Sequence, residues 1–161
     1  MQEKHNIPPV YNEESKILIL GSFPSVKSRE AAFFYHHPQN RFWRVLAAVT
    51  GSSVPGTIEE KREFLLKNGI AVWDVLAGCE IQGSSDSSIR NAEPNDLSCI
   101  LEKADIRCIY VNGGTADRFY RKYIYPETKR EAVRLPSTSP ANAACSLEKL
   151  IEAWSVIREF L

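Results

Sequence analysis

Polar and aromatic residues that could act on a ligand follow three short apolar segments of this chain. The stretch GSFPS occupies residues 21–25, and an asparagine followed by two glycines occupies residues 112–114. The third stretch, residues 136–142, begins with PSTSP. Glycine adopts backbone angles that other residues avoid and proline lacks a backbone donor, so these residues end a strand. The carboxyl ends of parallel strands share one edge of a sheet, and we expect a ligand site there.

Two asparagines carry an amide that could recognise a planar heterocycle. Asn112 offers a donor and an acceptor side by side, which suits the N–H/C=O edge of a lactam. An ordinary Asn-Gly turn is the alternative role, and the residues alone leave both open. Asn40 directly precedes the start of a helix pattern, and asparagine is a preferred N-cap residue, so helix capping is its alternative role.

Four titratable side chains are candidates for acid–base chemistry. His36 and His37 carry imidazoles that titrate near neutrality, but the sequence identifies no carboxylate partner for either. Asp74 and Asp86 are the nearest carboxylates in polar surroundings. Asp86 lies in the serine-rich run of residues 83–88, where a turn position explains it equally well.

The cysteine and histidine pattern indicates no metal site. The chain has four cysteines and three histidines, and no two cysteines have C-x-x-C spacing. We therefore expect structural thiols, no metal and no cofactor.

Length and composition indicate one globular domain over residues 1–161. The formal net charge is zero, which argues against a protein that coats nucleic acid through bulk charge. Local clusters of Lys and Arg remain, at residues 27–44 and 118–134, and the second cluster fits a solvated helix face. No apolar run is long enough to cross a membrane and the N-terminus has no signal-peptide core, so we expect a cytoplasmic protein without membrane contact.

Strand and helix patterns alternate along the chain. Apolar runs predict strands over residues 16–21, 70–76, 106–111 and 132–135. Apolar periodicity and capping signals predict helices over residues 42–50, 57–67, 94–104, 115–123 and 147–161, and we interpret residues 1–15 as a loop. This alternation predicts an α/β fold with a parallel sheet and helices on both faces.

Two of these motifs resemble a known family. The stretch GSFPS, followed by FFYHHPQNRFW at residues 33–43, resembles the first motif and following loop of the uracil-DNA glycosylase superfamily. PSTSP at residues 136–140, followed by SLEKLIEAW, resembles its second motif. The similarity is greatest to the mismatch-specific uracil/thymine enzymes and the hypoxanthine-DNA glycosylase branch, and it runs from about Lys16 to the C-terminal helix. It implies a three-layer α/β/α sandwich around a short, mainly parallel four-stranded sheet.

The resemblance implies a pocket for an extruded base. Tyr35 aligns with a stacking Phe of the mismatch-specific enzymes, and Asn112 with an Asn that hydrogen-bonds the base. Gly21, Ser22 and Phe23 would contribute backbone and side-chain groups to the same pocket. The alternative is that Tyr35 is a packing residue, which is our interpretation of the neighbouring Phe33 and Phe34.

Both motifs depart from the superfamily pattern where bond cleavage is concerned. Phe23 stands where related enzymes carry the Asn or Asp that positions the attacking water, and Leu135 stands where the main uracil branch has a histidine. The hypoxanthine branch is similar in lacking the first polar residue and in depending on the Asn of H-P-x-N. We therefore assign the catalytic role to Asn40, which would orient water or the leaving base because an amide is a poor base.

The motifs also imply contacts with DNA. Phosphate contacts are expected from hydroxyl and amide groups and a lysine, at Ser22, Ser25, Lys27, Ser137 and Ser139. The loop over residues 138–144, which includes Pro140, is expected to enter the minor groove where the base has left the stack. We expect a monomeric DNA glycosylase of base excision repair that removes a deaminated base, preferably hypoxanthine, from double-stranded DNA. The alternatives are a uracil/thymine mismatch-specific glycosylase and a catalytically silent binder of damaged DNA.

Overall fold

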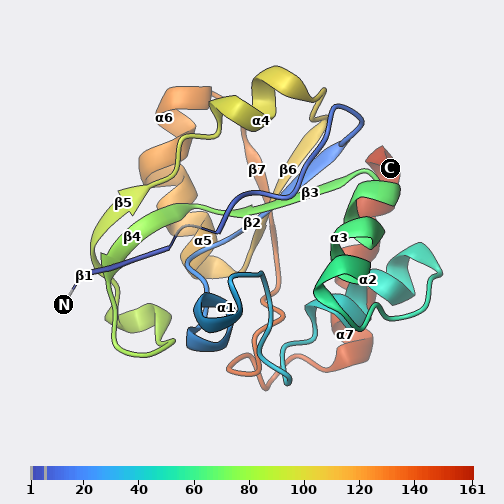
Figure 1. The fold of residues 1–161 in the computed structure, drawn as a ribbon, viewed down its shortest axis with the longest axis horizontal. Helices are drawn as coiled ribbons and strands as arrows, with labels where there is room; N and C mark the ends of the chain where they lie inside the picture. Colours follow the sequence, from blue (N-terminus) through green and yellow to red (C-terminus); the bar gives the residue numbers. More distant parts are fainter. Residues whose placement is uncertain (1, 6) are drawn as a thin grey trace.

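A four-stranded parallel sheet forms the centre of the computed structural model, which describes residues 2–5 and 7–161 (Figure 1). Its strands are β2 (Ile17–Gly21), β3 (Ile70–Asp74), β6 (Cys108–Asn112) and β7 (Ala132–Leu135), in the order β3-β2-β6-β7. All three neighbouring pairs are parallel. Gly21 is opposite Asp74 and Asn112 is opposite Leu135, so the strands end together at one edge. The predicted four-stranded parallel sheet is confirmed.

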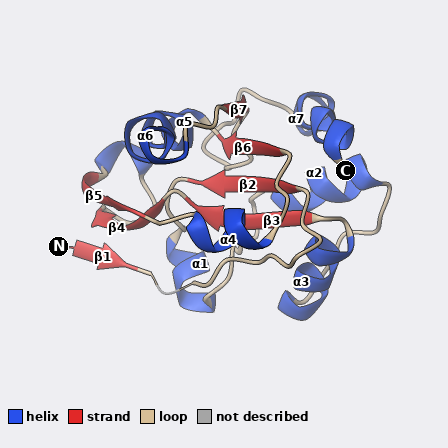
Figure 2. Ribbon diagram, turned by 90° about the horizontal axis from the view of Figure 1, so that it is seen from above, coloured by secondary structure: helices blue, strands red, loops and turns tan. Residues whose placement is uncertain are grey.

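Helices cover both faces of this sheet, which confirms the three-layer arrangement (Figure 2). One face packs against α2 (Phe42–Thr50), α3 (Ile58–Lys67), α7 (Leu147–Trp154) and the 3-10 segment η3 (Ser155–Phe160). The other packs against α4 (Ser98–Lys103), α5 (Gly114–Phe119), the π-helical segment η2 (Tyr120–Ile124) and α6 (Tyr125–Thr128). Strand β2 is buried throughout because Ile17 and Ile19 join the first core and Leu18 and Leu20 the second. This double burial explains its unbroken apolar sequence.

Local signals set the ends of two helices as expected. Thr57 and Glu60 form a reciprocal capping box at the start of α3, each side chain accepting from the other residue's backbone N–H over 3.1 Å. Gly51 ends α2 with a φ of 70°, a left-handed conformation that glycine adopts without steric penalty.

A second, antiparallel sheet is the main difference from the sequence prediction. It consists of β1 (Gln2–Lys4), β4 (Leu76–Glu80) and β5 (Arg90–Pro94), in the order β1-β4-β5. The strand predicted over 70–76 is therefore wrong at its end, because the chain leaves the parallel sheet after Asp74. The loop predicted over 1–15 is wrong for β1, and the helix predicted from residue 94 begins at Ser98. Strands β1 and β5 contain no fully buried residue, so they give no apolar signal in the sequence.

Two short helical segments also lie near the carboxyl edge. The helix α1 (Val26–Ala31) follows the GSFPS stretch and buries only Ser28, and η1 (Asp86–Ser88) lies in the serine-rich run. Neither has an apolar stripe that the sequence could reveal. Among the described residues, none of the helices combines the length and apolar character that a bilayer span requires.

Candidate active site

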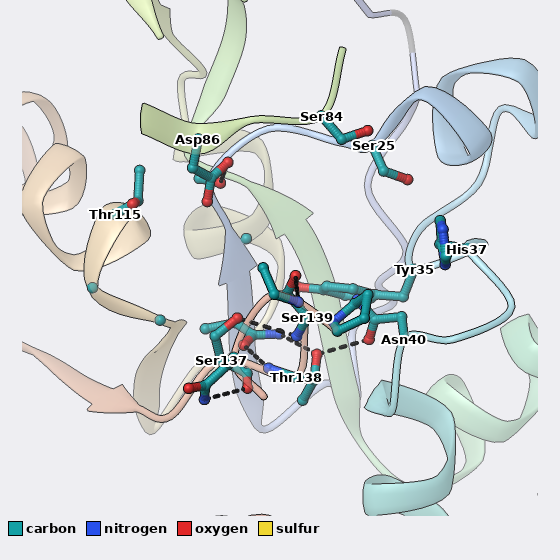
Figure 3. Close-up of a pocket in the computed structure, with 18 of the residues that line it drawn as sticks. Ser25, Tyr35, His37, Asn40, Ser84, Asp86, Thr115, Ser137, Thr138 and Ser139 are labelled. Atoms are coloured by element: carbon teal, nitrogen blue, oxygen red, sulfur yellow. Dashed lines mark hydrogen bonds between the residues drawn. The ribbon is translucent and has the colours of Figure 1, made fainter. Parts of the chain in front are cut away.

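A cleft of about 1010 Å³ lies at the carboxyl edge of the parallel sheet. All three stretches that the sequence identified, residues 21–25, 112–114 and 136–142, contribute to its lining. In the close-up of Figure 3, Thr138 and Ser139 lie beside Asn40 and Tyr35. The sheet brings these segments together because each follows a parallel strand that ends there.

Thr138 connects the two candidate asparagines (Figure 3). Its side chain is fully buried, and its hydroxyl donates to Asn40 Oδ1 over 2.8 Å while accepting from Asn112 Nδ2 over 3.1 Å. Its backbone N–H donates to Asn112 Oδ1 over 3.0 Å. The sequence analysis gave Thr138 no individual role. Its position inside the PSTSP motif was the one feature that could have indicated a place in the site. The result is one network that joins the H-P-Q-N loop, β6 and the second motif.

The orientation of the Asn40 amide follows from its partners. Its Oδ1 accepts from the backbone N–H of Phe42 over 2.9 Å and from the Thr138 hydroxyl. A backbone N–H can only donate, so the amide oxygen must face Phe42. Within the described part of the chain, Nδ2 has no hydrogen-bond partner, and Asn40 lines the cleft. Asn40 thus satisfies the first turn of α2 and retains a free N–H donor.

Asn112 is anchored at both ends of its amide by Thr138. The Asn-Gly turn is present as well, because Gly113 has a φ of 98° and donates its N–H to Leu135 O over 2.9 Å. An amide oxygen can accept twice and an amide nitrogen can donate twice. Asn112 therefore keeps one acceptor and one donor position beyond those that Thr138 occupies.

Tyr35 lines the cleft with its ring stacked on Phe42, at a centroid separation of 3.8 Å and an interplanar angle of 17°. Its φ is 50°, an uncommon value for a tyrosine, and its carbonyl accepts from Trp43 Nε1 over 3.1 Å. Burial and the nearby Asp74 raise the pKa of its phenol. The Asn112 amide is near enough to offset part of this rise, but the Tyr35 hydroxyl has no partner with hydrogen-bond geometry among the described residues.

Asp74 lies at the floor of the cleft, at the end of β3. Only 3% of the residue is exposed, and its Oδ2 is a buried atom without a hydrogen-bond partner among the described residues. A Cβ at Gly21 would lie 2.6 Å from Asp74 Oδ1 and 3.0 Å from the Tyr35 hydroxyl, so glycine is required at this position. Burial and the like charge of Asp86 raise the pKa of the Asp74 carboxyl to about 8.

Ser22 and Phe23 have different surroundings although they are neighbours. Ser22 Oγ donates to Asp86 Oδ1 over 3.0 Å. Asp86 also lines the cleft, so its role is not limited to a turn. Burial raises the pKa of Asp86, and the Ser22 hydrogen bond and the Arg118 charge oppose this rise. The Phe23 ring is buried against His5, with centroids 5.3 Å apart, and beneath Arg29. Phe23 also touches the cleft, but most of its ring belongs to the second core.

The residues expected to contact DNA divide into two groups. Ser25, Ser137, Ser139 and Pro140 line the cleft. Ser25 also caps α1, its hydroxyl accepting from Ser28 N over 3.2 Å. Lys27 is placed outside the cleft lining, with its Nζ 4.0 Å from Glu30 Oε1 on the exposed side of α1.

Arg41 holds the second-motif loop, a role that the sequence did not reveal. Its Nη2 donates to Ser139 O over 3.1 Å and to Asn142 O over 3.0 Å, and its Nη1 donates to Cys145 O. Its backbone N–H donates to Thr138 O over 3.1 Å. The guanidinium therefore points into the protein, toward backbone carbonyls.

Neither histidine of the H-H-P run gains a carboxylate partner among the described residues. His37 lines the cleft, and its Nδ1 accepts from Gln39 N over 3.1 Å, which shapes the loop. The Nδ1 of His36 is buried without a hydrogen-bond partner there, and the ring does not line the cleft. In the described residues no three His, Cys, Asp or Glu side chains are grouped as metal ligands.

A model of the Uracil DNA glycosylase superfamily matches residues 8–158, and the chain belongs to this superfamily. Two curated relatives are each named hypoxanthine DNA glycosylase. The protein of Methanosarcina acetivorans is 35% identical over 157 residues, which is 96% of this chain and 98% of the relative. That of Methanosarcina barkeri is 34% identical over 113 residues, which is 69% of this chain and 72% of the relative.

A solved structure has the same fold. It is a solution NMR structure of a Methanosarcina acetivorans protein described as a candidate uracil DNA glycosylase. The TM-score is 0.83 at 34% identity, and the match covers 99% of both chains. The resemblance inferred from the two motifs is thereby confirmed.

Proposed function

We propose that this chain is a monofunctional DNA glycosylase that hydrolyses the N-glycosidic bond of deoxyinosine in double-stranded DNA and releases hypoxanthine. The observation that carries this proposal is the Asn40–Thr138–Asn112 network at the edge of the cleft. The two relatives named hypoxanthine DNA glycosylase support the choice of base. A monomeric state, a cytoplasmic location and a role in base excision repair are part of the same proposal.

The cleft offers the surfaces that an extruded base requires. Tyr35, supported from behind by Phe42, would stack on one face of the base. Asn112 would use its remaining donor and acceptor for the N1–H and O6 edge of hypoxanthine. The chain at Gly21, Ser22 and Phe23 would line the opposite side with backbone groups.

Asn40 would act through its amide N–H. Its oxygen is already engaged by Phe42 and Thr138, so the group that it presents to the cleft is a donor. A donor can hold the oxygen of the attacking water or an acceptor of the base, but it cannot remove a proton. Asn40 would therefore orient a reactant in the transition state, which is where binding energy accelerates a reaction.

Phosphate groups next to the extruded nucleotide would be bound at the rim of the cleft. Ser25, Ser137 and Ser139 would contribute hydroxyl and backbone N–H contacts, and Lys27 a charge further out. Pro140, in the same loop, would face the minor groove.

The test is base release from duplexes that hold one deoxyinosine, deoxyuridine, deoxyxanthosine or thymine mismatch. We expect hypoxanthine to be released fastest. The decisive variant is Asn40→Asp, which keeps Oδ1 for Phe42 and Thr138 but removes the Nδ2 donor; we expect a loss of ~10²-fold or more. Gln39→Ala, on the exposed neighbour, is the matched control and should retain full activity.

Other outcomes would select among the alternatives. Uracil or thymine released ahead of hypoxanthine would identify a mismatch-specific enzyme. No release, combined with retarded migration of the damaged duplex, would identify a silent binder. Full activity in Asn40→Asp would remove Asn40 from the reaction.

A further inference from the structure

Purine release requires a place for the electrons of the broken glycosidic bond. A proton delivered to the departing base is the usual means, and such a donor must lie within reach of the base. The second motif of this chain reads Leu135-Pro136-Ser137 and places no imidazole beside it. His37 lines the cleft, but its Nδ1 is engaged by Gln39.

Asp74 is a buried acid whose Oδ2 lies 3.9 Å from His5 Nε2, beyond hydrogen-bond distance. It lines the cleft, it is 3% exposed, and Oδ2 has no hydrogen-bond partner among the described residues. The Tyr35 hydroxyl, beside the same Gly21 surface, is a second buried group without a partner there. Buried polar atoms are normally hydrogen-bonded, so two such groups on one floor indicate a ligand that completes them.

We propose that Asp74, as a carboxylic acid, donates its proton to N7 of the departing 6-oxopurine. This inference rests on the proposed function, since it names the group that activates the leaving base. Hypoxanthine carries an acceptor at N7, whereas uracil has no such atom. The floor would thus favour purine release.

The overall reaction is a hydrolysis of the glycosidic bond. The C1′–N9 bond breaks and its electron pair remains with the base, while N7 takes the proton of Asp74. Hypoxanthine leaves as a neutral N7–H tautomer. Water adds its oxygen to C1′ and releases a proton to solvent, and Asp74 is reprotonated from solvent for the next cycle.

The surroundings of Asp74 keep it protonated near neutral pH. Burial is the main cause and the Asp86 charge adds to it, which together raise the pKa to about 8. His5 Nε2 lies 3.9 Å from Asp74 Oδ2 but also 2.8 Å from the Leu76 carbonyl, which fixes its proton there. His5 Nδ1 accepts from Ile7 N, and burial lowers the pKa of the ring, so His5 is neutral and offers no cation. The Tyr35 phenol stays protonated as well.

The experiment is the pH dependence of single-turnover hypoxanthine release from the duplex. In the wild type we expect the rate to fall about tenfold per pH unit once Asp74 ionises. Asp74→Asn cannot transfer a proton, so we expect ~10²-fold slower release at pH 7 and a flat profile at higher pH. Asp105→Asn, an exposed carboxylate far from the cleft, is the control and should follow the wild type. Thermal unfolding verifies that each variant folds.

A duplex with 7-deazadeoxyinosine tests the acceptor atom, because a carbon replaces N7. We expect the rate ratio of deoxyinosine to its 7-deaza analogue to be larger in the wild type than in Asp74→Asn. Equal ratios, or an Asp74→Asn variant with wild-type rate and pH profile, would overturn the inference while leaving the glycosylase intact. A wild type that releases no hypoxanthine would instead refute the proposed function itself.

Discussion

The buried hydroxyl of Thr138 determines which atoms the two asparagines can offer. It donates to Asn40 and accepts from Asn112, and a single hydroxyl proton allows only this direction once Asn40 Oδ1 also serves Phe42 N–H. Asn40 is thereby held as a donor toward the cleft. The N-cap position predicted for Asn40 is wrong, because Arg41 is the N-cap residue of α2, and Asn40 accepts from Phe42 N–H from the position before it. This contact uses the amide oxygen and leaves the amide nitrogen for the proposed catalytic role.

Thr138→Val should test this network, since it exchanges the hydroxyl for a methyl group of similar size. Both amides lose a partner, and we expect the free energy of unfolding to fall by about 1–3 kcal/mol. Hypoxanthine release should fall at least ~10-fold because Asn40 can then rotate. Thr138→Ser restores the hydroxyl. It should recover most of the stability and most of the release rate, as measured by denaturation and single-turnover assays. A fully active Thr138→Val would show that the network does not hold the reacting groups.

Asp74 should also affect stability in a pH-dependent way. Burial and the Asp86 charge raise its folded-state pKa from the ordinary 3.8 to about 8. Between these values the folded state holds a proton that the unfolded state has released, so the free energy of unfolding falls as pH rises. The loss is at most about 1.4 kcal/mol per pH unit.

Asparagine does not titrate, so Asp74→Asn avoids this loss. Its free energy of unfolding should therefore rise relative to that of the wild type from pH 5 to pH 8. We expect similar melting temperatures near pH 5 and a higher one for Asp74→Asn at pH 8 and above. Asp105→Asn is again the control. Parallel melting curves for wild type and Asp74→Asn across this range would show that Asp74 ionises normally.

Among the elements, α2 and α7 hold the second-motif loop in place. Arg41, at the start of α2, donates to three backbone carbonyls of residues 139–145. Trp154, at the end of α7, donates its Nε1 to Pro136 O over 2.9 Å and is fully buried. The loop has no regular secondary structure of its own, so these side chains set its position.

Arg41→Ala should release this loop without removing a group from the cleft lining. We expect faster amide hydrogen exchange within residues 139–145 and a free energy of unfolding lower by about 2–4 kcal/mol, because three carbonyls lose a charged donor. The exposed Arg44 on the same helix is the matched control, and Arg44→Ala should change stability by about 0.5 kcal/mol or less. Unchanged exchange in the loop would contradict the role given to Arg41.

For the whole molecule, a formal net charge of zero makes the local placement of cations decisive. Among the described residues, the cleft lining includes the cations Arg134, from β7, and Lys149, from the first turn of α7. The Arg134 guanidinium lies against Gly114, where a Cβ would be 2.7 Å from its Nη2. Both belong to the carboxyl edge, where the backbone of a bound duplex would pass.

Arg134→Ala and Lys149→Ala should each weaken duplex binding and make its salt dependence shallower by about one unit of log–log slope. Fluorescence anisotropy at several salt concentrations measures this slope. Lys67→Ala is the control because α3 ends at the opposite, amino edge of the sheet, and its slope should equal that of the wild type. Equal slopes in all three variants would place the duplex elsewhere.

The sequence by itself determined the parallel sheet, its flanking helices and the three loops that form the cleft. Apolar runs, helical periodicity and turn residues are local properties, so Ile17–Gly21, the Thr57 cap and Asn112-Gly113 could be recognised from neighbouring residues alone. Strands β1 and β5 lacked such a signal because they expose most of their side chains. Only the tertiary structure decided the partners within the cleft, where Thr138 meets Asn40 across 98 positions of the chain. Burial is likewise a property of the assembled fold, and it makes Asp74 an acid with a raised pKa.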